Sequence, residues 1–238
     1  MSSNFAQFCQ RTGLRRSLLV IAPHPDDETI GCGGLIALAA ASGVCVVVVV
    51  VTDGAASHPG SATWPPERIA HRRKREVLRA IEILGVKASP HFLNLPDTQT
   101  ATIAGAIRQG ACDRLAGVIE EHQPDVVLTT WRREPHCDHR FSYALTRDSM
   151  QDASSSAMLV EYMVWTYLIG AADDRPRPHE TAGFLLDVGD VRSRKRSALA
   201  AHRSQLGRII RDDPGGFALS RAHMRTMTIG EERFELPH

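Results

Sequence analysis

Two short segments of this chain place histidine beside aspartate, as metal-binding loops do. They read His24-Pro25-Asp26-Asp27-Glu28 and His136-Cys137-Asp138-His139. Adjacent carboxylates repel one another, and a divalent cation between them offsets that cost. Imidazole and carboxylate together suit zinc, and a catalytic zinc ion takes three protein ligands and leaves a fourth position open. The two segments therefore predict a metal site, with side chains left over for acid–base chemistry.

Each segment also has an explanation that involves no chemistry. An aspartate before a helix often only caps it, and a pair of histidines usually lies on the surface or in the core. The argument for a metal depends on finding two such segments, each after an apolar run that predicts a buried strand. These runs are 17–22, ended by Pro23, and 125–130.

The apolar runs alternate with helical segments along the chain. Val44–Val51 is valine at every position except Cys45, and β-branched residues at nearly every position are typical of a central parallel strand covered on both faces. Further strands are predicted at 91–95, 125–130, 160–169 and 184–188, and helices at 31–42, 66–84, 103–122, 139–152 and 191–206. The alternation predicts an α/β fold, a Rossmann-like three-layer sandwich with a mostly parallel central sheet.

No linker divides the chain convincingly, so we expect a single α/β domain over 16–206. An N-terminal extension over 1–15 would precede it, and a tail of turns over 207–238 would follow and pack on the same domain. In open α/β sheets the site lies beyond the carboxyl ends of the strands. Four loops qualify by this rule: 24–28, 52–64, 96–98 and 131–139.

Composition narrows the class of protein. The net charge is +1, which gives no reason to expect nucleic acid or an anionic membrane as a partner. The five cysteines are scattered and odd in number, which favours a reducing compartment over a disulfide framework. Residues 1–16 lack the apolar core of a signal peptide, and no apolar run approaches the roughly 20 residues of a membrane helix. We expect a cytoplasmic protein without a transmembrane segment, and the sequence leaves open whether it forms a homo-oligomer.

The two His/Asp segments carry a resemblance to a known family. Residues 22–28, Ala-Pro-His-Pro-Asp-Asp-Glu, followed by Gly31-Cys32-Gly33-Gly34, resemble the signature loop of the LmbE/PIG-L family of zinc-dependent N-acetylglucosaminyl deacetylases. The segment at 136–139 matches that family's second motif, His-x-Asp-His. The similarity covers roughly residues 16–206, so it implies an LmbE-like fold with Zn²⁺ as cofactor.

The resemblance also implies a division of roles. Three residues would hold zinc: His24, Asp27 and His139. Asp26 would be the general base that takes a proton from the attacking water. His136 would stabilise the oxyanion or protonate the leaving amine, and Asp138 would orient or charge His136.

Two further positions resemble substrate-binding residues of the family. Arg73 lies in a segment similar to the family's Arg-x-x-Glu helix, and Asp97 in a segment similar to its Leu-Pro-Asp loop. Each also has a simpler explanation, since Arg73 could be a surface residue and Asp97 a turn former after proline.

The expected activity is hydrolysis of a linear amide bond: removal of an acetyl or other acyl group from the nitrogen of an N-acetylated amino sugar or its glycoconjugate. Two alternatives stay open. The substrate could be a related non-sugar amide, or the protein could be catalytically degenerate and only bind metal or sugar. A nucleotide-binding module is less favoured, because Gly31-Cys32-Gly33-Gly34 departs from Gly-x-Gly-x-x-Gly and the acids beside it would repel a pyrophosphate. A cysteine-nucleophile enzyme is weaker still, since no cysteine has a clear base beside it.

Overall fold

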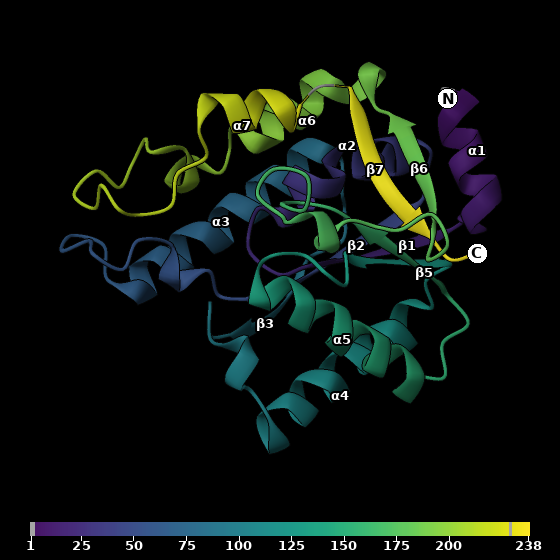
Figure 1. Cartoon of the computed structure of the whole chain (residues 1–238), viewed down its shortest axis with the longest axis horizontal. Helices are drawn as coiled ribbons and strands as arrows, with labels where there is room; N and C mark the ends of the chain where they lie inside the picture. Colours follow the sequence, from purple (N-terminus) through teal and green to yellow (C-terminus); the bar gives the residue numbers. More distant parts are fainter. Residues whose placement is uncertain (1–2, 229) are drawn as a thin grey trace.

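The computed structural model describes residues 3–228 and 230–238, which form one seven-stranded sheet between layers of helices (Figure 1). The strand order is β3-β2-β1-β4-β5-β7-β6. The strands are β1 (Ser17–Ala22), β2 (Cys45–Thr52), β3 (His91–Leu95), β4 (Val126–Thr130), β5 (Met158–Tyr162), β6 (Ala182–Asp187) and β7 (Glu231–Leu236). The first five are parallel, and β7 pairs antiparallel with both β5 and β6. The mostly parallel sheet of the predicted fold is confirmed.

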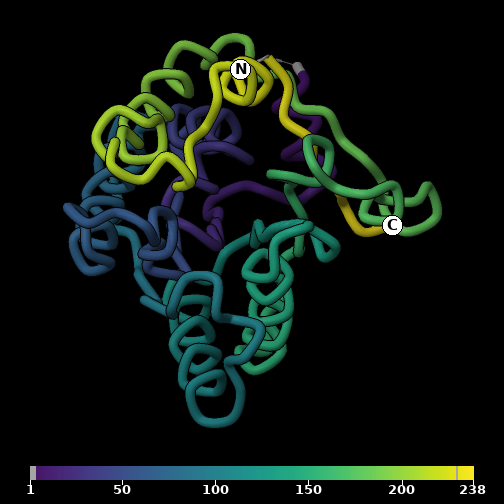
Figure 2. The backbone as a smooth tube through the Cα atoms, turned by 60° about the vertical axis from the view of Figure 1, so that its left-hand side comes forward, coloured from purple at the N-terminus to yellow at the C-terminus, as the bar shows by residue number. Residues whose placement is uncertain are grey.

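Helices cover both faces of the sheet. They are α1 (Ser3–Thr12), α2 (Asp27–Ala41), α3 (Pro66–Leu84), α4 (Gly105–His122), α5 (Cys137–Asp152), α6 (Arg192–Leu199) and α7 (Arg221–Thr226). Two views agree that α4 and α5 lie on the opposite side of the sheet from α6 and α7 (Figures 1 and 2). None of the helices within the described ranges is long and apolar enough to cross a membrane.

The valine run of β2 shows why this fold follows from the sequence. Val46, Val48 and Val50 pack in the core on the face covered by α1, α2, α3 and α6. Val47, Val49 and Val51 pack in the core beneath α4 and α5. Successive side chains of a strand point to opposite faces, so a strand with two covered faces needs apolar residues at every position.

The C-terminal part of the chain differs from the prediction. Residues 231–236 were expected to be turns, and instead form β7 between β5 and β6. The local sequence hides this strand, because three of its six residues are glutamates. Buried Glu232 accepts hydrogen bonds from the backbone N–H of Gly34 and Leu35 and from the ammonium of Lys195. These long-range partners, and not a local pattern, hold β7 in the sheet.

Two other predicted elements are too long. The strand expected over 160–169 ends at Tyr162, because the backbone N–H groups of residues 164–166 turn to the carboxylate of Glu134. The helix expected over 191–206 ends at Leu199 and is followed by a 3-10 turn over Arg203–Leu206.

The start of α2 is packed against β5 so closely that only glycine fits. A Cβ at Gly31 would lie 2.3 Å from Cδ2 of Tyr162. The Tyr162 ring cannot easily move, because it is fully buried and its hydroxyl donates to the carbonyl of Ile21 at 2.8 Å. Both His/Asp segments lie at this edge, since α2 follows β1 and α5 follows β4.

We expect Gly31→Ala to lower the free energy of unfolding by about 1–3 kcal/mol, because the new methyl group overpacks the contact with Tyr162. Gly110→Ala is the matched control in α4, where a Cβ meets nothing within 4 Å. It should raise the free energy by about 0.5–1 kcal/mol, since alanine is the better helix former. Urea denaturation measures both, and an equal effect of the two variants would contradict the packing argument.

Candidate metal centre and active site

A tight turn after β1 presents the first His/Asp segment. The backbone N–H of Asp26 and of Asp27 both donate to the carbonyl of His24, at 2.9 and 3.2 Å. Asp26 adopts φ 157° and ψ −20°, a region that residues other than glycine rarely occupy. Such strain is found at functional sites when the surroundings enforce it. The unusual backbone of Asp26 directs the two adjacent carboxylates to different partners. Asp27 contacts histidines, whereas Asp26 contacts Arg73.

Three donor atoms from the two segments form a triangle in the interior. Asp27 Oδ2 lies 3.1 Å from His24 Nδ1 and 3.2 Å from His139 Nε2, and the two nitrogens lie 3.3 Å apart. All three side chains are buried. A tetrahedral zinc ion with ligands at about 2.0–2.1 Å holds donor atoms about 3.3–3.4 Å apart. The triangle therefore has the size and the donor types that a zinc ion requires.

Other sets of three donors lie close enough to share an ion. They are His24 with His136 and His139, His136 with Cys137 and Asp138, and His24 with Asp97 and Asp138. The Cys137 thiol is a poor ligand here, because burial and the neighbouring Asp138 raise its pKa and keep it protonated. The loops thus gather one cluster of donors that could hold a metal.

The far nitrogens of both triangle histidines meet carboxylates. His24 Nε2 lies 3.0 Å from Asp138 Oδ2 and 3.1 Å from Asp97 Oδ1. His139 Nδ1 lies 3.3 Å from Glu134 Oε2. Metal-binding histidines usually have such a partner, which fixes the ring and makes the ligand nitrogen more basic.

Asp138 contacts both His24 and His136. Its carboxylate contacts His24 and accepts hydrogen bonds from Thr98 N–H and the Thr100 hydroxyl. Its backbone N–H donates to His136 Nδ1 at 3.2 Å, and its charge raises the pKa of His136 against the effect of burial. The carboxylate thus bonds to His24, while the role implied by the resemblance, to orient or charge His136, stays a prediction.

Arg73 is buried, so the explanation of it as a surface residue is wrong. Its guanidinium donates to Asp26 Oδ1 at 3.1 Å and to the carbonyls of Gly54 and Pro25 at 3.0 and 3.2 Å. Burial raises the pKa of Asp26 to about 6, and the charge of Arg73 limits this rise. Arg73 thereby positions one oxygen of Asp26 and tunes its basicity.

Asp97 and His136 also lie at the cluster. Asp97 is buried, contacts His24 and accepts a hydrogen bond from the N–H of Ala56 at 3.0 Å. His136 is half-buried, and its ring centroid lies 4.7 Å from that of His24 and 5.4 Å from that of His139. Burial and the two neighbouring imidazoles lower the pKa of His136 to about 4.

Sequence reasoning missed Glu134. This residue is fully buried and accepts hydrogen bonds from the N–H groups of residues 164–166 as well as contacting His139. The two arginines of the same loop are paired within the protein, Arg132 with Glu161 and Arg133 with Glu180. The only available signal in the sequence was a carboxylate five residues before the ligand candidate His139.

His202 is fully buried. Its Nε2 lies 3.3 Å from Glu28 Oε1 and 3.2 Å from the Thr29 hydroxyl. It supports the helix that begins at Asp27 and contacts no donor of the triangle in the described ranges.

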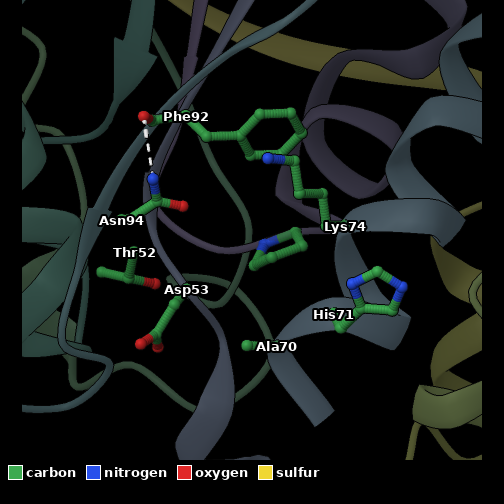
Figure 3. Close-up of a pocket in the computed structure, with 8 residues that line it drawn as sticks. Thr52, Asp53, Ala70, His71, Lys74, Phe92 and Asn94 are labelled. Carbon is green, nitrogen blue, oxygen red and sulfur yellow. Dashed lines mark hydrogen bonds between the residues drawn. The ribbon is translucent and has the colours of Figure 1, made fainter. Parts of the chain in front are cut away.

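A separate pocket of about 230 Å³ lies beside the first turn (Figure 3). Its lining combines Pro25 and Asp53, which follow β1 and β2, with residues of β2, α3 and β3, namely Thr52, Ala70, His71, Lys74, Phe92 and Asn94. The Lys74 ammonium lies over the Phe92 ring, 4.4 Å from its centroid. No donor of the triangle lines this pocket, so it is a neighbour of the metal cluster and not the cluster itself.

Comparison with known proteins agrees with this geometry. The family model for PIG-L, GlcNAc-PI de-N-acetylase, matches residues 19–150. The chain belongs to the PIG-L family. This PIG-L chain is 31% identical over 201 residues to diacetylchitobiose deacetylase of Thermococcus kodakarensis, covering 80% of this chain and 70% of the relative.

Two further relatives extend the comparison of this PIG-L chain. It is 28% identical to 1D-myo-inositol 2-acetamido-2-deoxy-alpha-D-glucopyranoside deacetylase of Mycobacteroides abscessus, covering 86% of each protein. The solved structure of N,N'-diacetylchitobiose deacetylase from Pyrococcus horikoshii superposes with a TM-score of 0.71 at 23% identity, covering 93% of this chain and 84% of that one. The resemblance to LmbE/PIG-L deacetylases and the fold it implied are confirmed.

The protonation of the cluster predicts how metal affinity depends on pH. Burial alone would lower the pKa of His139, but Asp27 and Glu134 raise it to about 9. Burial likewise opposes the charge of His24, yet Asp138, Asp27 and Asp97 raise its pKa well above the usual value. Both imidazoles of the metal-free protein are therefore protonated at neutral pH, and a metal must displace their protons.

We expect the affinity for Zn²⁺ to rise with pH across the neutral range and to level off above about 9, the pKa of His139 in the metal-free protein. Competition with a chromogenic chelator at a series of pH values measures this slope. An affinity that stays constant over this range would show that neutral imidazoles are already present.

Proposed function

We propose that this protein is a zinc-dependent hydrolase that removes the acetyl or another acyl group from the amide nitrogen of an N-acetylated amino sugar or its glycoconjugate. The observation that carries the proposal is the buried triangle of His24, Asp27 and His139 with a separate carboxylate, Asp26, beside it. The names of the relatives support the class of substrate, because each denotes deacetylation of an N-acetylated sugar.

His24, Asp27 and His139 would hold the zinc ion. The spacing of their donor atoms supports this choice, as do the carboxylates that meet the far nitrogens of both imidazoles. In such a site zinc supplies a Lewis acid that polarises the acyl carbonyl and makes water acidic enough to react near neutral pH.

Asp26 would act as the general base. Arg73 holds Oδ1 of its carboxylate at 3.1 Å, whereas no residue in the described ranges bonds to Oδ2. Oδ2 is therefore the atom that would take the proton from the attacking water. A pKa of about 6 keeps Asp26 mostly ionised at neutral pH while making it more basic than an ordinary aspartate.

His136 would stabilise the developing oxyanion. Protonation of the leaving amine, the other role implied by the resemblance, requires a cationic ring, and the lowered pKa of His136 favours the neutral one. Its Nδ1 accepts the N–H of Asp138, so a neutral ring carries its proton on Nε2. A half-buried Nε2–H at the rim of the cluster is a donor that the substrate can reach. Asp138 would orient or charge His136, which its backbone N–H contacts, and its carboxylate would also orient His24.

Arg73 and Asp97 remain candidates for substrate contact. Their bonds to the protein support a positioning role more directly, because Arg73 holds Asp26 and Asp97 contacts His24. A cytoplasmic location, the absence of a nucleic-acid partner and the domain bounds 16–206 stay predictions.

Metal content separates the ligands from the catalytic residues. We expect His24→Ala to lose stoichiometric zinc, because one corner of the triangle is gone. His136→Ala should keep zinc while its kcat for acetate release falls by about 10²–10³, the usual cost of one oxyanion donor. Elemental analysis and an acetate assay on a panel of N-acetyl sugars measure both. Loss of zinc in His136→Ala would overturn this division, and no acetate release by the zinc-loaded parent protein from any sugar would overturn the substrate class.

The base assignment predicts a pH profile. Asp26→Asn should lose about 10²–10⁴ in kcat/KM, because the amide cannot accept the proton. In the parent protein kcat/KM should rise with pH through about 6, since only the ionised carboxylate is a base. Arg73→Gln should move this rise to higher pH, because the charge of Arg73 lowers the pKa of Asp26. Full activity of Asp26→Asn would rule out this base.

A further inference from the structure

Helices α6 and α7 lie side by side at one end of the molecule (Figure 1). Residues of both helices line a groove of about 790 Å³. Five arginines line it: Arg192, Arg196, Arg208, Arg221 and Arg225. All five are exposed, and none has a hydrogen bond or ion pair from its side chain to any residue of 3–228 or 230–238. An arginine on a protein surface commonly finds a carboxylate, so five without one in a single groove need an explanation.

The charge of this part of the chain is strongly uneven. Residues 191–228 contain nine Lys and Arg side chains and two aspartates, in a chain whose net charge is only +1. The two aspartates are committed elsewhere: Asp212 bonds to Ser61 and Thr63, and Asp213 accepts the N–H of Gly60. No acidic side chain lines the groove. Its positive potential is therefore not neutralised from within the described ranges.

The arginines are spaced to form two rows. Arg192 and Arg196 are four residues apart on α6, and Arg221 and Arg225 are four residues apart on α7. Like charges at this spacing lie on one helix face and destabilise a helix by a few tenths of a kcal/mol. Both helices carry the same unfavourable pair, and both pairs line the same groove.

The orientation of α6 is set by its inner face. Lys195 is buried, and its ammonium donates to Glu232 Oε1 at 2.7 Å and to the carbonyl of Ile30 at 2.9 Å. Ala198 and Leu199 pack in the core on the same side. With this face anchored, α6 cannot turn to take Arg192 and Arg196 out of the groove.

We propose that this groove binds a small molecule that carries two or more phosphate groups. Guanidinium groups match phosphate oxygens with paired hydrogen bonds, and several of them bind a polyvalent anion far better than one. The Ser193 hydroxyl, which has no partner among the described residues, adds a neutral donor to the lining. The site is independent of the proposed hydrolase chemistry, because it shares no residue with the metal cluster.

The shape favours a small ligand over a macromolecule. The helices that carry the two rows are only eight and six residues long, which is a short track for a nucleic-acid backbone. None of the large exposed apolar side chains, such as Ile169 or Phe217, lines the groove, so an apolar anchor for a membrane surface is missing there. A hollow with converging arginines instead suits a compact polyanion.

The test measures tripolyphosphate binding to the full chain by isothermal titration calorimetry at 0.15 M salt. We expect saturable binding that Arg196→Gln/Arg225→Gln, with one change in each row, weakens about tenfold or more. Arg192→Gln/Arg221→Gln should do the same. The matched control is Arg194→Gln/Arg203→Gln, which removes equal charge from exposed positions outside the groove and should stay within about twofold of the parent.

Several results would overturn the proposal. One is the absence of saturable binding to the parent protein, and another is an equal loss in the control, which would indicate only general charge attraction. Single-stranded DNA or vesicles with anionic lipid that bind the groove more tightly than tripolyphosphate, without being displaced by it, would assign a macromolecular partner instead. Thermal unfolding of each variant shows that it is folded, and binding is read without turnover, so failure here leaves the proposed hydrolase untouched.

Discussion

A buried carboxylate held between two imidazoles is the interaction on which the rest of the site depends. Asp27 is 1% exposed and lies within 3.2 Å of ring nitrogens of both His24 and His139. A charge removed from water in this way is costly unless it is paired and hydrogen-bonded. The pairing requires the end of β1 to meet the start of α5, which the neighbouring positions of β1 and β4 in the sheet provide.

The need to pair buried polar groups extends to the other loops at the same edge of the sheet. The other nitrogen of each imidazole that faces Asp27 lies beside a carboxylate: Asp138 bonds to His24, and Glu134 Oε2 lies 3.3 Å from His139 Nδ1 as an ion-pair partner. Those carboxylates need donors in turn: the loop after β3 supplies Thr98 and Thr100 to Asp138, and the turn over 164–166 supplies backbone N–H groups to Glu134. Four strand ends are thereby tied to one small cluster, and the irregular turn after β5 becomes part of it.

The same arrangement gives two adjacent aspartates different chemistry. The histidines around Asp27 outweigh its burial and hold its pKa well below the usual range, whereas burial raises the pKa of Asp26 to about 6 despite the charge of Arg73. When the environments of two titratable groups move their pKa values apart, the two groups suit different roles in acid–base chemistry. The unusual backbone of Asp26 accompanies this separation, because it sends the two side chains to different partners.

The sequence by itself determined the parallel part of the sheet and the two segments that meet at its edge. A valine at almost every position of β2 requires two covered faces, and the carboxyl ends of parallel strands must share one edge. Only the tertiary structure decided which groups pair there. His24 and Asp138 are 114 residues apart, and the bonds of Glu134, the burial of Arg73 and the place of β7 are equally non-local. The local pattern of residues shows which face of a helix or strand is apolar. The hydrogen-bond partner of a buried polar group depends instead on which distant segments the fold brings beside it.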